Sequence, residues 1–266
     1  MEQLLHPFDS ALELTKENNH FHGRTSPAYA NMIGPFGGIT AAAMLKAVIE
    51  HPEVQGEPLT LTVNFAAAVK DGDYQIEAQA VRTGRSTQHW FVSMIQGDEV
   101  VTTATAIFAT RRETWGATDL AFPSLPAEAK PISTKMMPPW AKNYQFRMMS
   151  EMADLIMADQ PKAETLQSIQ DDPPRPLDFL SLTAMADVFP PRVMIRRAKF
   201  VPMGTVAFTV YFHVNSATLA AHGDGELIGH AQANRYYNQY ADQSAELWTP
   251  AGDLLVTSTQ IVYFKE

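Results

Sequence analysis

Cysteine is absent from this sequence of 266 residues. Without cysteine the chain cannot form a disulfide scaffold, a thiolate zinc site or an iron–sulfur cluster, and it has no cysteine nucleophile. A secreted protein that depends on disulfides is therefore excluded. The length suits either one large domain or two domains of roughly 100–150 residues.

The sequence also lacks a long apolar run and an excess of basic residues. No stretch approaches the roughly 18–20 apolar residues of a membrane-spanning helix, and the acidic start does not follow the basic-then-apolar order of a signal peptide. We therefore expect a cytoplasmic protein without a membrane span. With 20 Lys and Arg against 29 Asp and Glu, the net charge of −9 argues against a nucleic-acid partner. It still permits a local basic pocket for an anionic ligand.

Several motifs of enzyme chemistry are missing as well. The sequence has no G-x-S-x-G nucleophile elbow, no phosphate-binding G-x-x-x-x-G-K-[ST] and no H-E-x-x-H zinc motif. His20 and His22 have a spacing that could ligate a metal, but no acidic or histidine cluster lies near them in the sequence. We therefore predict no metal and no cofactor.

Proline divides the chain into two blocks. Half of the 18 prolines lie in residues 113–176. Proline fixes φ and removes a backbone donor, which predicts a connector that stays out of sheet interiors. One helix is predicted within it, over Met148–Ala158. The flanking blocks, residues 1–112 and 177–266, are then the two folded units.

Each block is patterned as one buried helix followed by strands. In the first block the run Gly37–Val48 begins with glycines and is apolar on nearly every face, as expected for a buried helix. The strand-like runs that follow it begin at Leu59, Tyr74, Thr87 and Val100. The second block has the same order, with a helix predicted over 177–189 and four strand-like runs after it. The pattern predicts an α+β unit, one buried helix wrapped by an antiparallel sheet, that occurs twice.

Two short matches support the repeat. Thr62–Phe65 resembles Thr209–Phe212, which lies 147 residues later, and Thr103–Ile107 resembles Thr257–Ile261, which lies 154 residues later. Short β motifs recur by chance, so the shared element order carries more weight than either match.

The two predicted helices differ in one charged residue. The first has no acid from Gly37 through Val48, whereas Asp187 stands in the apolar run of the second. A carboxylate in such surroundings needs partners because burying it alone is unfavourable. Asp187 is therefore a candidate general base, and the alternative is a cap at the break before Pro190.

The order of these segments resembles the acyl-CoA thioesterase II (TesB-like) family of double hotdog proteins. The resemblance is carried by GPFGG with its helix, LTLTVNF, TAMADVFPP, GTVAFTVYFH and LLVTSTQ. It covers nearly the whole chain and is weakest in the proline-rich connector. It implies hydrolysis of an acyl-CoA to a carboxylic acid and CoA, with an Asp, a Thr and a Gln holding the water. These fall on Asp187, Thr205 and Gln260.

The chemistry of that set is coherent. A carboxylate, a hydroxyl and an amide can position one water, with Asp187 as general base and Thr205 and Gln260 as orienting groups. Backbone N–H groups at Gly37 and Gly38 could bind the substrate's developing oxyanion, because glycine allows close approach. Close helix–sheet packing is an equally good explanation of these two glycines.

Other functions stay open at this stage. A noncatalytic protein that binds acyl-CoA or another hydrophobic ligand could use the same scaffold. A hydratase acting on enoyl-CoA ranks lower because no histidine lies near Asp187 in the sequence. The basic residues that could meet an anionic CoA are Arg82, Arg85, Arg111, Arg112, Arg196, Arg197, Lys199 and Arg235. Free sheet edges and helix faces favour a homo-oligomer, a dimer or higher.

Overall fold

A computed structural model gives the structure of the chain and describes residues 5–17, 20–149 and 159–266. The helical elements are α1 (Pro7–Ala11), η1 (Pro27–Tyr29), α2 (Gly37–Ile49), η2 (Pro139–Asn143), α4 (Phe179–Met185), α5 (Arg192–Arg197) and α6 (Ser216–His222). The strands of the first half are β1 (Thr15–Glu17), β2 (His20–Arg24), β3 (Glu57–Phe65), β4 (Asp73–Thr83), β5 (Thr87–Gln96) and β6 (Glu99–Ala109). The remaining strands are β7 (Lys130–Pro131), β8 (Tyr144–Met148), β9 (Thr165–Asp171), β10 (Met203–Phe212), β11 (Leu227–Gln232), β12 (Tyr236–Tyr237), β13 (Tyr240–Trp248) and β14 (Leu254–Phe264).

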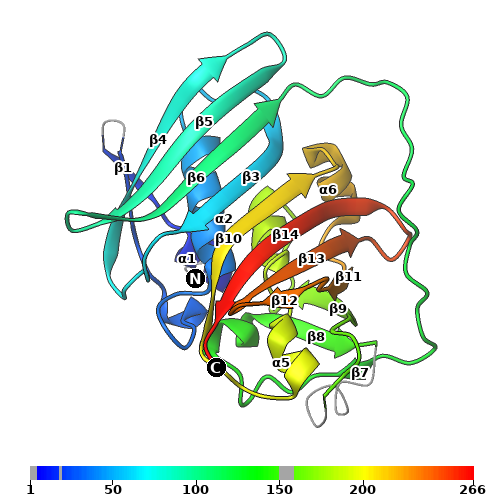
Figure 1. Cartoon of the computed structure of the whole chain (residues 1–266). Coiled ribbons are helices and arrows are strands. Elements are labelled where there is room, and N and C mark those ends of the chain that lie inside the picture. The colour runs from blue at the N-terminus through cyan, green and yellow to red at the C-terminus, as the bar shows by residue number, and fades with distance from the viewer. Residues whose placement is uncertain (1–4, 18–19, 150–158) are drawn as a thin grey trace.

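The strands form one antiparallel sheet that curves around two central helices (Figure 1). Its order is β1-β2-β4-β5-β6-β3-β10-β14-β13-β11-β9-β8-β7, and β12 pairs with β13. From the junction of β3 with β10, the order β3-β6-β5-β4-β2 on one side corresponds to β10-β14-β13-β11-β9 on the other. Each half is therefore a hotdog unit, and the predicted α+β double hotdog is confirmed.

A pseudo-twofold axis passes through the junction of the halves. Thr62 of β3 lies directly opposite Thr209 of β10, and their hydroxyls are 3.1 Å apart. These two residues are the pair that the sequence match had equated. The pairing irregularity after Thr205 on β10 also has its counterpart after Pro58 on β3. The repeat is therefore matched in register as well as in order.

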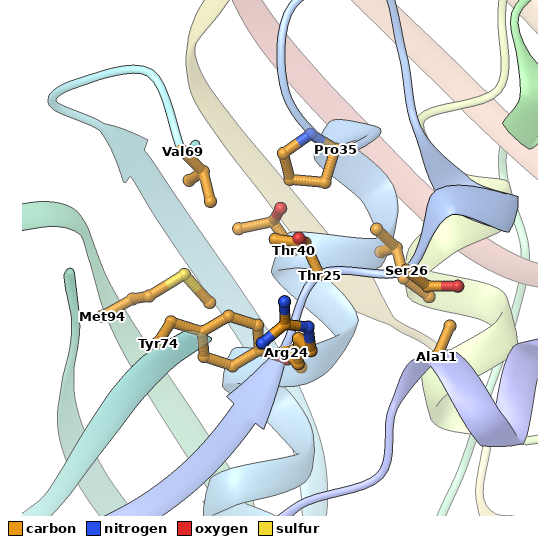
Figure 2. Close-up of a pocket in the computed structure, with 11 residues that line it drawn as sticks. Ala11, Arg24, Thr25, Ser26, Pro35, Thr40, Val69, Tyr74 and Met94 are labelled. Atoms are coloured by element: carbon orange, nitrogen blue, oxygen red, sulfur yellow. The ribbon is translucent and has the colours of Figure 1, made fainter. Parts of the chain in front are cut away.

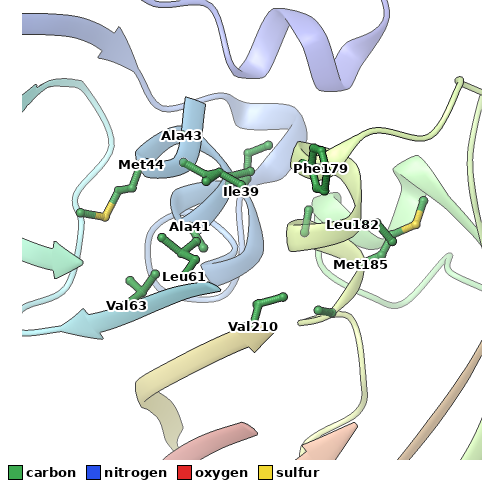
Figure 3. Close-up of a cluster of buried hydrophobic side chains, with 14 of the residues drawn as sticks. Ile39, Ala41, Ala43, Met44, Leu61, Val63, Phe179, Leu182, Met185 and Val210 are labelled. Atoms are coloured by element: carbon green, nitrogen blue, oxygen red, sulfur yellow. The ribbon is translucent and has the colours of Figure 1, made fainter. Parts of the chain in front are cut away.

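The two central helices pack against each other at this axis. All but three residues of α2 are buried, as its apolar composition predicts. The N-cap of α4 is Asp178, whose side chain accepts from the Ser181 N–H in a capping box. Figure 3 shows the apolar cluster between them, with Ile39 of α2 facing Phe179 and Leu182 of α4 over the β3–β10 junction. This shared core joins the two halves.

The predicted second helix is shorter than expected. It was placed over 177–189, but α4 ends at Met185, and Asp187 lies in the turn beyond it. The chain then reaches Pro190 and Pro191, which cannot continue a helix because they lack a backbone N–H. Within the described residues, no helix has the length and apolar character required to cross a bilayer.

The predicted connector also needs a correction. Residues 110–129 do cross the outside of the second half without helix or strand (Figure 1). However, β9 pairs with both β8 and β11 and so lies inside the sheet. The expectation that proline keeps all of residues 113–176 out of sheet interiors is wrong here, because the prolines flank these two strands without interrupting them. Residues 150–158 of the helix predicted over Met148–Ala158 lie outside the described residues; Met148 ends β8, and Met149 follows it in a bend.

Candidate functional site

Asp187 lies where the C-terminal end of α4 meets the N-terminus of α2. Its carboxylate accepts hydrogen bonds from the Gln260 side chain and from the backbone N–H of Gly38. Asp187 keeps some solvent-accessible surface but sits deep among protein atoms, and this burial raises its pKa to about 7. The two hydrogen bonds oppose that shift because they favour the charged form. A carboxyl group with this pKa can exchange a proton near neutral pH.

Gln260 and Thr205 reach Asp187 from two neighbouring strands. The Gln260 Nε2 donates to Asp187 Oδ1 at 2.6 Å, and the Thr205 hydroxyl donates to Gln260 Oε1 at 3.2 Å. Gln260 is on β14 and Thr205 on β10, beside the irregularity that shifts the pairing of these strands. The result is a chain of hydrogen bonds from Thr205 through Gln260 to the carboxylate. In this arrangement Thr205 fixes the Gln260 amide, and the amide fixes Asp187.

Gly37 and Gly38 bring the first half into the site. A Cβ on Gly37 would lie 2.8 Å from Asp187 Oδ2, and a Cβ on Gly38 would lie 2.7 Å from the Ala184 carbonyl oxygen. Any larger residue would therefore collide with the carboxylate or with α4. The residue before Gly37 is Phe36, whose side chain has no acceptor to cap α2. Asp187 supplies that acceptor from the other half. The two glycines therefore combine both explanations, because they allow close packing and they also bind a carboxylate.

The symmetry-related position in the first half lacks the same groups. At the two offsets of the repeat, Pro58 corresponds to Thr205 and Ala106 to Gln260. The structure supports this correspondence, because Ala106 lies opposite Leu61 just as Gln260 lies opposite Phe208. Neither Pro58 nor Ala106 has a polar side chain. The three-residue set is therefore formed by the second half alone.

Neither of the two hollows described next is lined by Asp187, Thr205 or Gln260. A cavity of about 10 Å³ between α2 and the first half of the sheet, lined by Thr40, Tyr74 and Met94 among others, has room for at most one water (Figure 2). A larger groove of about 700 Å³ lies between α5, β12 and the C-terminal end of β14. Arg196 and Arg197, two of the basic candidates for CoA contact, line this groove.

Two of the other basic candidates, Arg111 and Arg235, and the two histidines of the proposed metal spacing have local partners. Arg111 donates to backbone carbonyls of Pro58 and Phe212, and the Arg235 guanidinium lies 5.0 Å from the Tyr237 ring centroid. His20 and His22 are on β2, facing Glu77 and Glu17 respectively. Among the residues that the structure describes, no group of three or more His, Asp or Glu side chains could hold a metal ion.

The fold and this site together define a double hotdog protein with one carboxylate-centred site. Residues 118–264 match the sequence profile of the acyl-CoA thioesterase C-terminal domain, and residues 26–109 match that of the N-terminal domain. The chain belongs to the acyl-CoA thioesterase family. No curated protein matches it.

Several solved structures share this fold. A conserved protein of unknown function with a hotdog fold, from Alicyclobacillus acidocaldarius, is 46% identical over 99% of both chains, with a TM-score of 0.95. A putative thioesterase II from Thermobifida fusca is 16% identical over 99% of both chains, with a TM-score of 0.84. The acyl-CoA thioesterase II TesB2 from Mycobacterium marinum is 17% identical over 97% of this chain and 96% of its own, with a TM-score of 0.75. The last two show the likeness of fold.

The sequence did not point to a group of buried polar residues behind the site. Tyr29, Tyr144 and Asp171 come from three distant segments and meet in the interior. Thr165–Asp171 has only two apolar residues, Leu166 and Ile169, spaced three apart, so its sequence gives no alternating strand signal.

Proposed function

We propose that this protein hydrolyses an acyl-CoA thioester to a carboxylic acid and CoA. The observation that carries the proposal is the hydrogen-bonded chain from Thr205 through Gln260 to a buried Asp187 at the N-terminus of α2. A carboxylate held in this way can accept a proton from a water beside the thioester. Membership of the acyl-CoA thioesterase family supports the same chemistry.

The reaction then needs no covalent intermediate on the protein. Asp187 Oδ1 is held by Gln260, which leaves Oδ2, next to Gly37, to accept the proton. The water oxygen attacks the thioester carbon and forms a tetrahedral intermediate, whose oxyanion is stabilised by the partial positive charge at the start of α2. The C–S bond then breaks, the carboxylic acid leaves, and the CoA thiolate takes up the proton from Asp187.

We propose that Gly38 positions the base, because its backbone N–H donates to Asp187. The Gly37 N–H is then our candidate donor to the oxyanion. Asp187, Thr205, Gln260 and Gly37 are thus proposed to act together at one site.

The pH dependence of the reaction tests the base. Asp187 acts only when ionised, and burial raises its pKa to about 7. We therefore expect kcat/KM to rise with unit slope up to about pH 7 and to level off above it. The measurement is thiol release from an acyl-CoA across a pH series. A profile that stays flat far below pH 7 would assign the base to another group.

Replacing Gln260 by leucine tests the hydrogen-bonded chain. The change removes a donor to the charged form of Asp187, so its pKa should rise and the acid limb of the profile should move about one unit to higher pH. Thr205→Val should move the limb in the same direction by less, because Thr205 acts through Gln260. If both variants kept the wild-type limb, these two residues would not control the base.

A further inference from the structure

The outer face of the sheet has a wide area without charged side chains. Strands β6, β3, β10 and β14 are neighbours in the middle of the sheet (Figure 1), and every second residue along them points away from the buried helices. The residues between, such as Leu61, Ala106 and Val210, are buried. We use the name threonine face for the twelve outward residues within 60–64 on β3, 103–107 on β6, 207–211 on β10 and 257–261 on β14.

The threonine face is continuous across the pseudo-twofold axis. Its central row consists of four threonines that lie opposite one another in turn, Thr105 on β6, Thr62 on β3, Thr209 on β10 and Thr259 on β14. The axis passes between the middle two of these threonines. The first half and the second half therefore contribute equal parts of one surface.

None of the twelve residues of the threonine face is Asp, Glu, Lys or Arg. The surface of a soluble protein is about 25–35% charged, which predicts about three or four charges among twelve such positions. Charges begin only beside the face, with Asp242 and Glu246 on β13 and Glu77 on β4. Depletion of charge is the compositional mark of the core of a protein–protein interface.

The threonine face stays open in the described part of the chain. Tyr211 and Ile261, its largest members on β10 and β14, are 45% and 42% exposed. The connector that crosses the outside of the second half packs Phe122 on Trp248, at the end of β13. The central strands are left uncovered, so this neutral surface is available to a partner.

Sheet edges and helix faces are less suitable for association. The sheet ends at β1 and β7, which have only three and two residues, and β7 is Lys130–Pro131. Short edge strands, lysine and proline all oppose the addition of another strand. The helices α2 and α4 are largely buried against each other and the sheet. The outer face of the sheet is the better candidate.

We propose that the threonine face binds the same face of a second copy of this chain, so that the protein is a dimer with its two sheets packed face to face. Two chains of net charge −9 repel each other, and a neutral contact leaves the acids of β13 and β4 at the rim. The two faces overlap most fully when their centres coincide, which places Thr62 and Thr209 against the same residues of the second copy. This proposal does not depend on the reaction at Asp187.

Charges introduced at the centre of the threonine face test the proposal. The mass of the full-length wild type is measured by sedimentation equilibrium at micromolar concentration, and we expect twice the mass of one chain. Thr209→Lys and Thr209→Glu each place like charges together in a homodimer, so each should raise the dimer Kd by at least about 100-fold. An equimolar mixture of the two variants should restore the dimer, because lysine then faces glutamate. Recovery in the mixture would also show that both variants are folded.

Val81→Lys is the matched control. Val81 is on β4, is 65% exposed and lies outside the threonine face, so its replacement adds the same charge at another exposed position. The dimer Kd should stay at the wild-type value. A monomeric wild type, dimers that persist in both variants of Thr209, or a mixture that stays monomeric would overturn the proposal. So would an equal loss of the dimer in Val81→Lys, because a general effect of charge would then explain it.

Discussion

Replacement of Asp187 by asparagine is expected to lower kcat for acyl-CoA hydrolysis by about 10²–10⁴-fold, the usual contribution of a general base. Asparagine keeps the shape of the side chain and can still accept from Gln260 Nε2 through its carbonyl oxygen. It cannot take a proton from water. Thiol release under substrate saturation measures the effect.

The same variant should fold at least as well as the wild type above pH 7. The folded-state pKa of Asp187 is raised above its ordinary value, so the folded state binds the proton more tightly than the unfolded state. The stabilisation from this proton is present at low pH and is lost as pH rises toward about 7. Asparagine removes the need to bury the charge, so its melting temperature at pH 8 should not fall below that of the wild type.

Asp98→Asn is the matched control, because it makes the same chemical change at an exposed turn between β5 and β6. Its kcat should equal that of the wild type. A wild-type rate in Asp187→Asn would remove Asp187 from the mechanism and favour the noncatalytic reading, especially if acyl-CoA still bound tightly.

Replacement of Gly37 by alanine is expected to have the second-largest effect, a loss of about 10²-fold in kcat. The added Cβ would lie 2.8 Å from Asp187 Oδ2, closer than such contacts occur, so the carboxylate must move. A displacement of about 1 Å at a catalytic group can reduce the rate by this factor. The KM should change less, because the rest of the binding surface is unaltered.

Gly116→Ala provides the comparison for this change. A Cβ at Gly116 meets nothing within 4 Å, and its backbone does not require glycine. Its activity and melting temperature should match those of the wild type. If Gly37→Ala kept full activity, Oδ2 would not be the atom that faces the water.

Much of the fold was predictable because the sequence pattern is local. The all-apolar run that forms α2 and the alternating runs that form β3 to β6 have one interpretation each. β8 and β9 were missed because the high proline content of residues 113–176 predicted a connector over the whole region. The pairing of β9 with β11 is a long-range contact that this local composition does not reveal. α6 was also missed, although Asn215 at its start caps the Thr218 N–H and is a recognisable signal.

The candidate site was predictable to a lesser degree. Asp187 stood out because an acid within an apolar run needs partners. Thr205 and Gln260 came only from the family resemblance, since their meeting depends on the register of β10 against β14. The buried polar group of Tyr29, Tyr144 and Asp171 could not be foreseen, because its members become neighbours only in the folded chain. The compartment and the oligomeric state stay predictions.

The axis through Thr62 and Thr209 also has a stoichiometric consequence. Two identical copies related by this axis would contain two equal centres, but Pro58 and Ala106 replace the polar residues in one of them. In the proposed mechanism the second repeat supplies the side chains of Asp187, Thr205 and Gln260, and the first repeat contributes only the start of α2. An inhibitor that titrates the centre should therefore saturate at one equivalent per chain.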